Sequence, residues 1–183
     1  NTDSKPEYLQ QFALMGSIYM EKVMGIDNPK VGLANIGTEE GKGNELAKTT
    51  YDLLKESNIN FIGNVEGRDI PYGAADVIVA DGFVGNMILK VTEGVALSLF
   101  GQLKDAFLKN TKNKIGALLL KSSLKELKSK IDYREYGGAP LLGTKQPIIK
   151  AHGSSDAYAI KNAIRQGINF VERDVIKTIE ANL

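Results

Sequence analysis

The chain has 183 residues, of which 43% are hydrophobic and 25% are charged, with 19 Gly and 5 Pro. This composition is typical of a globular protein with one substantial core, and it excludes a disordered or collagen-like chain. The sequence contains no cysteine, which excludes disulfides, a cysteine nucleophile and cysteine-ligated metals within these residues and fits a reducing cytoplasm. The strictly apolar runs are short and the start shows no signal-peptide pattern, so we expect no membrane span, and the initial Asn1 suggests a fragment.

The net charge of +1 conceals an uneven distribution of charge. Residues 103–131 carry a net charge of +6, which leaves −5 on the rest of the chain. The lysines of this segment are Lys104, Lys109, Lys112, Lys114, Lys121, Lys125, Lys128 and Lys130, and its acids are Asp105 and Glu126. Such a block suggests an anionic partner, and a solvated helix face is the alternative.

Helices and strands alternate in the predicted order of elements. Apolar residues at helical spacing predict a helix over residues 6–24, followed by a strand over 30–37 and a second helix over 45–57. Strands are predicted over 60–67 and 76–82, and then helices over 85–109 and 114–131. A fourth strand, 147–153, and a helix over 154–180 complete the chain.

This order indicates an α/β fold with a mostly parallel open sheet and helices on both faces. We expect residues 1–183 to form one α/β unit, with residues 85–131 as a projecting helical hairpin that contacts a second subunit or a membrane. In open parallel sheets, ligands bind beyond the carboxyl ends of the strands. The polar loops 37–44, 64–69, 81–86 and 150–155 should therefore meet at one edge of the sheet.

The loop Gly37–Glu45, GTEEGKGNE, is rich in glycine and precedes a helix. Its spacing fits neither a P-loop nor the dinucleotide-binding fingerprint. Glycines still let backbone N–H groups approach an anion, the helix dipole favours one, and Lys42 adds a positive charge. Anion binding is the favoured interpretation, and a tight turn capped by Asn44 is the alternative.

A second group of polar residues stands in KAHGSSD, residues 150–156, where Lys150 precedes the only histidine, His152. A lone histidine is more often structural, and Ser154 or Ser155 would also suit a helix N-cap. The absence of a histidine cluster argues against a zinc site. The position after a strand keeps a catalytic role open.

Acidic and basic residues follow the second and third strands, in VEGRD (65–69) and ADGFVGN (80–86). These carboxylates could orient basic groups, transfer protons or hold a divalent cation, whereas Asp81 could simply form a turn before Gly82. An apolar helix stripe, Leu120, Leu124, Leu127 and Ile131, predicts burial against a helix or a second subunit, with a membrane surface as the alternative because lysines flank it.

Six segments in order, including VGLANIGTEEGKGNEL, FIGNVEGRDIP, DVIVADGFVGNMILK, EYGGAPLLG and IKAHGSSDAYAIKNAIRQ, resemble the PlsX-type phosphate acyltransferases of bacterial phospholipid synthesis. The first of the six is KPEYLQQFALMGSIYMEKV. The resemblance covers nearly all of the chain, which corresponds to the C-terminal half or slightly more of a member of that family. It implies a fold similar to the isocitrate and isopropylmalate dehydrogenases, and a homodimer.

The activity that the resemblance implies is conversion of fatty acyl-[acyl carrier protein] and inorganic phosphate to acyl phosphate and free carrier protein. No cofactor is expected. Nucleic-acid binding is not expected either, since the lysines lack interleaved aromatic residues. We further expect contact with an anionic inner membrane face and with a glycerol-3-phosphate acyltransferase. The alternatives are a metal- and NAD-dependent hydroxy-acid dehydrogenase of the same fold class, with Asp69 and Asp81 holding the cation, and a membrane-docking scaffold.

We take Lys150 and His152 as the catalytic candidates, which would stabilise the oxyanion or protonate the leaving thiolate. The candidates for binding substrate or phosphate share the predicted sheet edge. They are Asn35, Gly37, Glu39, Gly41, Lys42, Gly43, Asn44, Asn64, Glu66, Asp69, Asp81, Asn86, Gly153 and Ser154.

Overall fold

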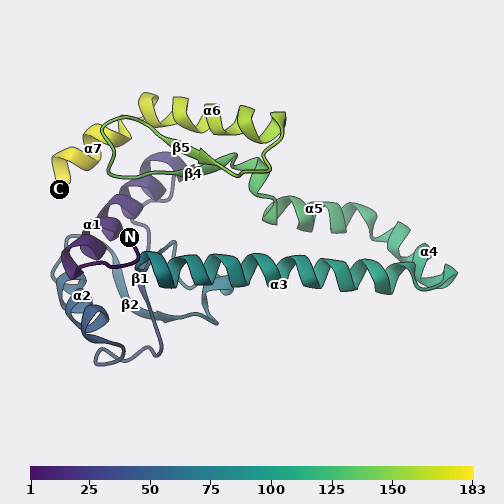
Figure 1. The fold of residues 1–183 in the computed structure, drawn as a ribbon, viewed down its shortest axis with the longest axis horizontal. Helices are drawn as coiled ribbons and strands as arrows, with labels where there is room; N and C mark the ends of the chain where they lie inside the picture. Colours follow the sequence, from purple (N-terminus) through teal and green to yellow (C-terminus); the bar gives the residue numbers. More distant parts are fainter.

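The computed structural model describes the backbone of residues 1–183, and all side chains except those of residues 128–131 and 133. Figure 1 shows a body of short strands and packed helices from which a long helical arm extends. Lys128, Lys130 and Ile131, which belong to the basic segment and the apolar stripe of the sequence, therefore lie outside the described side chains.

A parallel three-stranded sheet forms the first half of the body. Strand β1 (Val31–Asn35) is central, and β2 (Phe61–Glu66) and β3 (Val77–Val79) flank it in the order β2-β1-β3. Leu33 of β1 is in register with Asn64 of β2 and with Val79 of β3. The predicted parallel pairing of the first three strands is confirmed, and their carboxyl ends lie at one edge.

Two helices cover one face of this sheet, α1 (Pro6–Tyr19) and α2 (Glu45–Lys55). Their buried side chains join those of the strands in one core cluster, which contains Leu9, Ala13, Val31, Leu33, Leu54 and Val79. Side chains alternate along a strand, so Gly32 and Ala34 point to the opposite face. In the described part of the chain no second layer of helices packs extensively on that face, where Ile62 stays 42% exposed, so the expected cover on both faces is not found.

The predicted fourth strand does not join the parallel sheet, and this expectation is wrong. Strand β5 (Ile149–Ala151) pairs antiparallel with β4 (Gly138–Pro140), in a separate two-stranded sheet. The cause lies in the glycines before and in β4. A Cβ on Gly138 would stand 2.6 Å from the carbonyl oxygen of Lys150, so only glycine allows this approach.

The last helical stretch is divided into α6 (Ala157–Glu172) and α7 (Val175–Asn182), because Asp174 adopts a left-handed conformation with φ 50°. Phe170, Val175 and Ile179 form a second core cluster with Met15 and Ile18 of α1. Helix α1 thus packs against the sheet on one side and against α6 and α7 on the other. Its last turns continue as the π-helical segment η1 (Met20–Met24).

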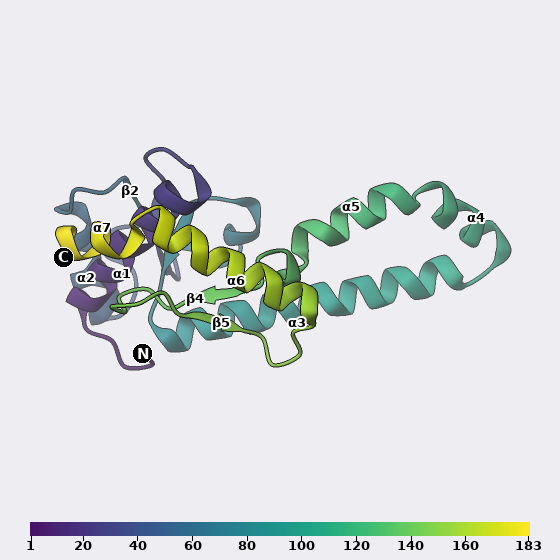
Figure 2. The ribbon, with the colours of Figure 1, turned by 90° about the horizontal axis from the view of Figure 1, so that it is seen from above.

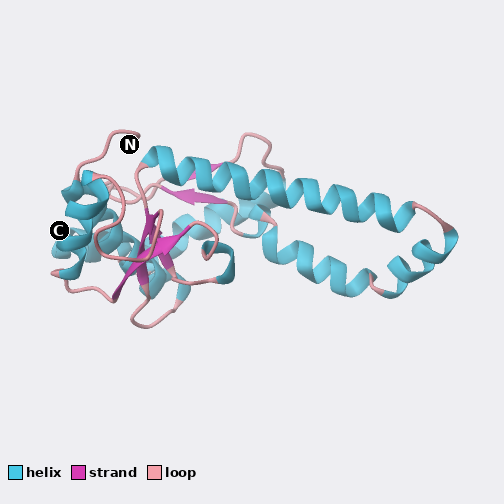
Figure 3. Ribbon diagram, turned by 90° about the horizontal axis from the view of Figure 1, so that it is seen from below, coloured by secondary structure: helices cyan, strands magenta, loops and turns pink.

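Helices α3 (Gly82–Leu108), α4 (Thr111–Leu119) and α5 (Lys121–Ile131) form the arm. In Figures 2 and 3 α3 runs away from the body, α4 lies at the tip, and α5 returns. The helix expected over 114–131 is thus two helices. Phe100, Leu103 and Phe107 of α3 and Leu124 of α5 line a cavity of about 260 Å³ between the two long helices. The 3-10 segments η2 (Ile70–Tyr72) and η3 (Tyr133–Glu135) complete the elements.

Helix α3 differs from the expectation that no segment approaches a membrane span. Its 27 residues are long and apolar enough to cross a membrane, a test of length and composition that core helices of soluble proteins also pass. None of its residues is buried in the structure. The short apolar runs of the sequence concealed this property, because single polar residues and glycines interrupt an otherwise apolar helix.

Candidate functional site

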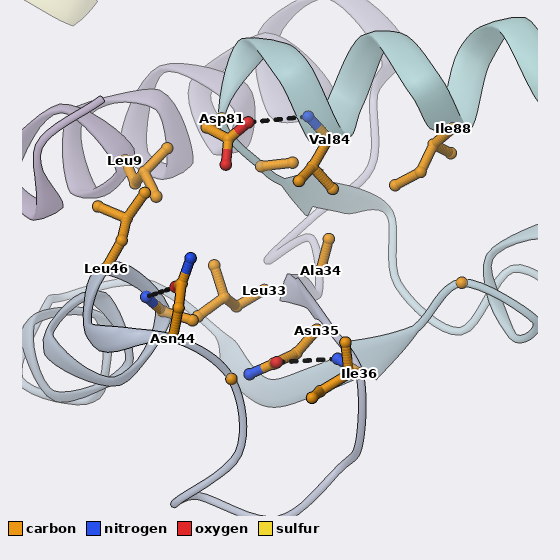
Figure 4. Close-up of a pocket in the computed structure, with 14 residues that line it drawn as sticks. Leu9, Leu33, Ala34, Asn35, Ile36, Asn44, Leu46, Asp81, Val84 and Ile88 are labelled. Carbon is orange, nitrogen blue, oxygen red and sulfur yellow. Dashed lines mark hydrogen bonds between the residues drawn. The ribbon is translucent and has the colours of Figure 1, made fainter. Parts of the chain in front are cut away.

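A pocket of about 460 Å³ opens where the three parallel strands end (Figure 4). The ends of β1, β2 and β3 form its floor, α1 and the start of α2 form one side, and the first turns of α3 form the other. Its lining residues are Leu9, Leu33, Ala34, Asn35, Ile36, Gly43, Asn44, Leu46, Ala47, Gly67, Ala80, Asp81, Val84 and Ile88. The position beyond the strand ends is where ligands bind in parallel sheets.

Both flanking helices begin at this pocket, and each is capped by a polar side chain of its lining. The Oδ1 atom of Asn44 accepts a hydrogen bond from the backbone N–H of Ala47 at 2.9 Å. The Oδ1 atom of Asp81 accepts from the N–H groups of Phe83 and Val84 at 2.9 and 2.8 Å. Asn44 caps α2, as the alternative interpretation of this loop had it, while Asp81 caps α3 and so starts that helix earlier than predicted.

An amide network fixes the loop that precedes α2. The Nδ2 group of Asn35 donates to the carbonyl oxygen of Lys42 at 3.1 Å and to Oδ1 of Asn64 at 3.0 Å. Asn64, only 6% exposed, donates in turn to the carbonyl oxygen of Glu39 at 2.8 Å. Gly43 turns the chain with φ 93°, and a Cβ there would stand 2.6 Å from Oδ1 of Asn35. The loop is therefore held in one shape from beneath.

The charges of this loop are mostly paired on its outer side. The Nζ atom of Lys42 lies 3.7 Å from Oε1 of Glu39, and both side chains are exposed. Glu40 contacts Lys55 at 2.9 Å and the hydroxyl of Tyr51 at 3.2 Å. The hydrogen bond from Lys55 holds the pKa of Glu40 below its usual range. Lys42 thus stands beside a carboxylate at the solvent-facing rim, and it does not line the pocket.

The remaining loop glycines differ in their surroundings. Gly37 is buried beneath the turn, where a Cβ would stand 2.8 Å from Oε2 of Glu39 and 3.0 Å from Cγ of Lys42. Gly41 is exposed, with open space where a Cβ would stand. Gly37 therefore serves the shape of the loop, whereas the Gly41 backbone is accessible to a ligand.

The polar residues after β2 and in α3 lie near the pocket but outside its lining. Glu66 pairs with Arg68 at 2.5 Å, and its carbonyl oxygen accepts from the N–H of Asp69 at 2.9 Å. Asn86 is exposed on α3. From this group only Gly67 lines the pocket.

The candidates Lys150, His152, Gly153 and Ser154 stand at the junction of β5 and α6, and none of them lines the pocket. Nδ1 of His152 lies 2.7 Å from the hydroxyl of Ser154 and accepts from its backbone N–H at 3.2 Å. Asp156, and neither serine, caps α6 by accepting from the N–H of Ala159 at 2.9 Å. The structure therefore divides the predicted site residues between two places, because β5 belongs to the second sheet.

Most residues of the pocket wall were not predicted from the sequence, because the candidates were the polar side chains and glycines of the loops. The missed residues are the apolar ones, among them Leu9, Leu46, Ala47, Val84 and Ile88. Leu46 and Ala47 follow directly after the Asn44 cap, and Val84 follows Asp81. The signal that could have found them is position, because the first turn of a helix that begins at a strand end faces the site.

Comparison with known proteins shows the family to which the chain belongs. Residues 1–178 match a family described as "Fatty acid synthesis protein". The chain is 62% identical over 179 residues to "Phosphate acyltransferase" of Alkaliphilus oremlandii, an alignment that covers 98% of this chain and 53% of the relative.

Two further relatives of the same name give the same result. The protein of Lysinibacillus sphaericus is 59% identical over 98% of this chain and 54% of its own length, and that of Brevibacillus brevis is 56% identical over 100% and 55%. The chain thus spans about half the length of the curated relatives it matches. The chain belongs to the fatty acid synthesis protein family, whose matching members carry the name phosphate acyltransferase.

Proposed function

We propose that this chain is part of a phosphate acyltransferase that converts fatty acyl-[acyl carrier protein] and inorganic phosphate to acyl phosphate and free carrier protein. The supporting observation is a pocket at the strand ends that combines apolar walls with the N-terminus of α2, whose cap is the uncharged Asn44. Apolar walls suit an acyl group, and helix N-termini suit an anion. The name of the relatives at 56–62% identity agrees with this combination.

The reaction that we propose is direct attack of phosphate on the thioester. A phosphate oxygen forms a bond to the thioester carbonyl carbon, the carbon–sulfur bond breaks, and the carrier leaves as a thiolate that takes up a proton. Phosphate is already anionic at neutral pH, so positioning and charge neutralisation matter more than deprotonation. Lys42 and the backbone of Gly41–Asn44 would hold the phosphate. Lys150 and His152 lie at the β5–α6 junction and do not line the pocket, so they would act only on a part of the substrate that extends to that junction.

The interaction partners form part of the same proposal. We propose a homodimer, a dehydrogenase-like fold for the whole protein, and a cytoplasmic enzyme that binds the inner membrane face reversibly, where a glycerol-3-phosphate acyltransferase would use its product. The arm supports this proposal, because Leu118 and Leu119 at its tip are 69% and 78% exposed. Lys112, Lys114 and Lys121 are exposed beside them.

A hydroxy-acid dehydrogenase remains the competing enzyme class. It would need Asp69 and Asp81 for a cation, yet one carboxylate oxygen of Asp81 accepts two backbone N–H groups as a helix cap. This use of Asp81 favours the acyltransferase.

The deciding experiment is an acyl-transfer assay on the intact protein that carries this chain. Fatty acyl-[acyl carrier protein] is supplied with and without inorganic phosphate, and the acyl phosphate that forms is trapped with hydroxylamine. Phosphate-dependent release of free carrier protein is the expected result. Binding of a nicotinamide nucleotide without any acyl transfer would instead support the dehydrogenase.

A further inference from the structure

We propose that the pocket at the strand ends is the acyl-chain subsite, with the thioester beside Asn44 at the start of α2 and the acyl chain running past Val84 to Ile88. This inference rests on the proposed function and adds to it the residues that hold the chain. The catalytic and phosphate-binding candidates from the sequence are polar residues and glycines, and none of them accounts for binding of the acyl chain.

The composition of the pocket wall carries the first step. Leu9, Leu33, Leu46 and Ala47 form one side of the pocket, and Val84 and Ile88 form the other. In Figure 4 the side chains of Val84 and Ile88 project from α3 toward Ala34 and Ile36 on the end of β1. Transfer of the methylene groups of an acyl chain from water to such a wall is favourable, at about 0.8 kcal/mol for each buried CH2.

The electrostatics of the pocket carry the second step. Asp81 is the only charged residue among the fourteen that line it, and its charge is negative. A carboxylate in a half-enclosed apolar space repels phosphate, so the interior is a poor phosphate site. The cation of the loop, Lys42, stands outside on the rim beside Glu39. The phosphate and the acyl chain would thus occupy separate places that meet at the start of α2.

The polar end of the pocket carries the third step. Asn44 uses its oxygen for the helix cap, and for its amide nitrogen no hydrogen-bond partner is found among the described residues. Figure 4 shows this nitrogen directed into the pocket, opposite the carboxylate of Asp81. An amide N–H can donate to a thioester carbonyl oxygen. The reactive carbon would then lie at the start of α2, next to the Gly41–Asn44 backbone proposed for phosphate.

The amide nitrogen of Asn44 at one side of the pocket and the apolar side chains of α3 at the other give the acyl chain a direction, from Asn44 along α3. Asn44 and Asp81 stand where α2 and α3 begin, with Leu9 and Leu46 near them, and Ile88 lies farther along α3, across the pocket from Ile36. A bulky side chain at Ile88 should shorten the chain that fits without disturbing the thioester. A small one should lengthen it.

The test measures acyl-chain selectivity in the intact protein, with fatty acyl-[acyl carrier protein] substrates whose acyl chains have 8 to 18 carbons. Ile88→Trp should lower kcat/KM for long chains about fourfold for each methylene displaced, at about 0.8 kcal/mol each. The loss should be smallest with the shortest acyl chain and should grow with chain length. Ile88→Ala should shift the preference toward longer chains.

The matched control is Leu89→Trp, the next residue of the same helix, which is 70% exposed and does not line the pocket. It should leave the chain-length profile as in the wild type. An unchanged profile in Ile88→Trp, or an equal loss for all chain lengths, would overturn the subsite. A wild type without phosphate-dependent transfer would overturn the proposed function itself, and the subsite with it.

Discussion

Lys42 is the residue on which the phosphate proposal depends most. It belongs to a loop whose carbonyl groups accept hydrogen bonds from Asn35 and Asn64, and among the described residues its own side chain pairs with Glu39 at 3.7 Å. A side chain that is 49% exposed contributes little packing. Its removal should therefore affect ligand binding and leave the fold intact.

Lys42→Ala in the intact protein should raise the KM for phosphate about tenfold, the lower range for loss of a charge-assisted hydrogen bond, while thermal stability stays unchanged. Lys48→Ala is the control, since Lys48 is an exposed lysine paired with Glu45 on the nearby helix. Initial rates at varied phosphate concentration measure the effect. Saturation by phosphate at the wild-type concentration would contradict the role of Lys42.

Asp156, the N-cap of α6, makes the stability of the protein depend on pH. The N–H of Ala159, with the guanidinium of Arg134, holds the pKa of Asp156 below its usual range. A carboxyl group whose pKa is lowered on folding stabilises the protein above its unfolded pKa of about 3.9, and this stability is lost as the pH falls through the folded value.

Asp156→Asn should keep an acceptor for the helix cap and lose this dependence. We expect the difference in melting temperature between wild type and variant to be largest near pH 6 and to shrink as the pH falls below about 4. Thermal unfolding followed by circular dichroism from pH 6 to pH 3 measures it, with Asp52→Asn on α2 as the control. Parallel curves for wild type and Asp156→Asn would contradict the prediction.

At the scale of elements, the sequence predicted those parts whose signals are local. The predicted strands 30–37, 60–67 and 76–82 contain the three parallel strands that the structure shows, with ends one to three residues too long. The fourth strand failed because IIKA reads alike in a parallel and an antiparallel sheet. Its true partner was hidden in a segment that, by its glycines, reads as a loop.

The candidate site, like the elements, was predictable only in part. The meeting of the loops after β1, β2 and β3 follows from parallel topology, and the structure brings Asn35, Asn44, Gly67 and Asp81 together there. The loop with His152 was assigned to the same edge through the failed strand. The apolar wall depends on which turns of α1 and α3 face the strand ends, and tertiary packing decides that.

Gly137 tests how β4 is attached to α6. It has φ 82°, and a Cβ would collide with the backbone of Asn162 and Ala163. Gly137→Ala should destabilise the protein by about 2–4 kcal/mol, from left-handed strain and overpacking together. Gly116→Ala, with open space in α4, should be neutral or stabilise by up to about 1 kcal/mol. Denaturant unfolding compares them, and equal effects would contradict the close packing.

At the scale of the molecule, α1 unites two core clusters, while the arm leaves the body with hardly any buried surface. Helix α3 exposes Val84, Met87, Val91, Val95 and Leu99 along one stripe. Helices expose such stripes where a partner covers them. The stripe begins at Val84, which also lines the pocket, so a second copy that packed against α3 would stand at the mouth of the site.

The tip of the arm carries the last prediction, which concerns anionic lipid. Leu118 and Leu119 are exposed beside Lys112, Lys114 and Lys121, and Figure 1 places α4 farthest from the strands. Each lysine near an anionic surface contributes about 1 kcal/mol, and inserted leucines add apolar burial. The sum supports peripheral, reversible attachment that salt weakens.

Sedimentation with vesicles of phosphatidylglycerol and phosphatidylcholine compares the wild type with Leu119→Glu and with Lys112→Glu/Lys114→Glu. Both variants should bind several-fold less lipid, because one loses the apolar insertion and the other reverses two charges, and 0.5 M salt should release the wild type. Sedimentation velocity reports the oligomeric state of each variant. Unchanged lipid binding, with a dimer lost only in Leu119→Glu, would show instead that the leucines complete a contact between two copies of the chain.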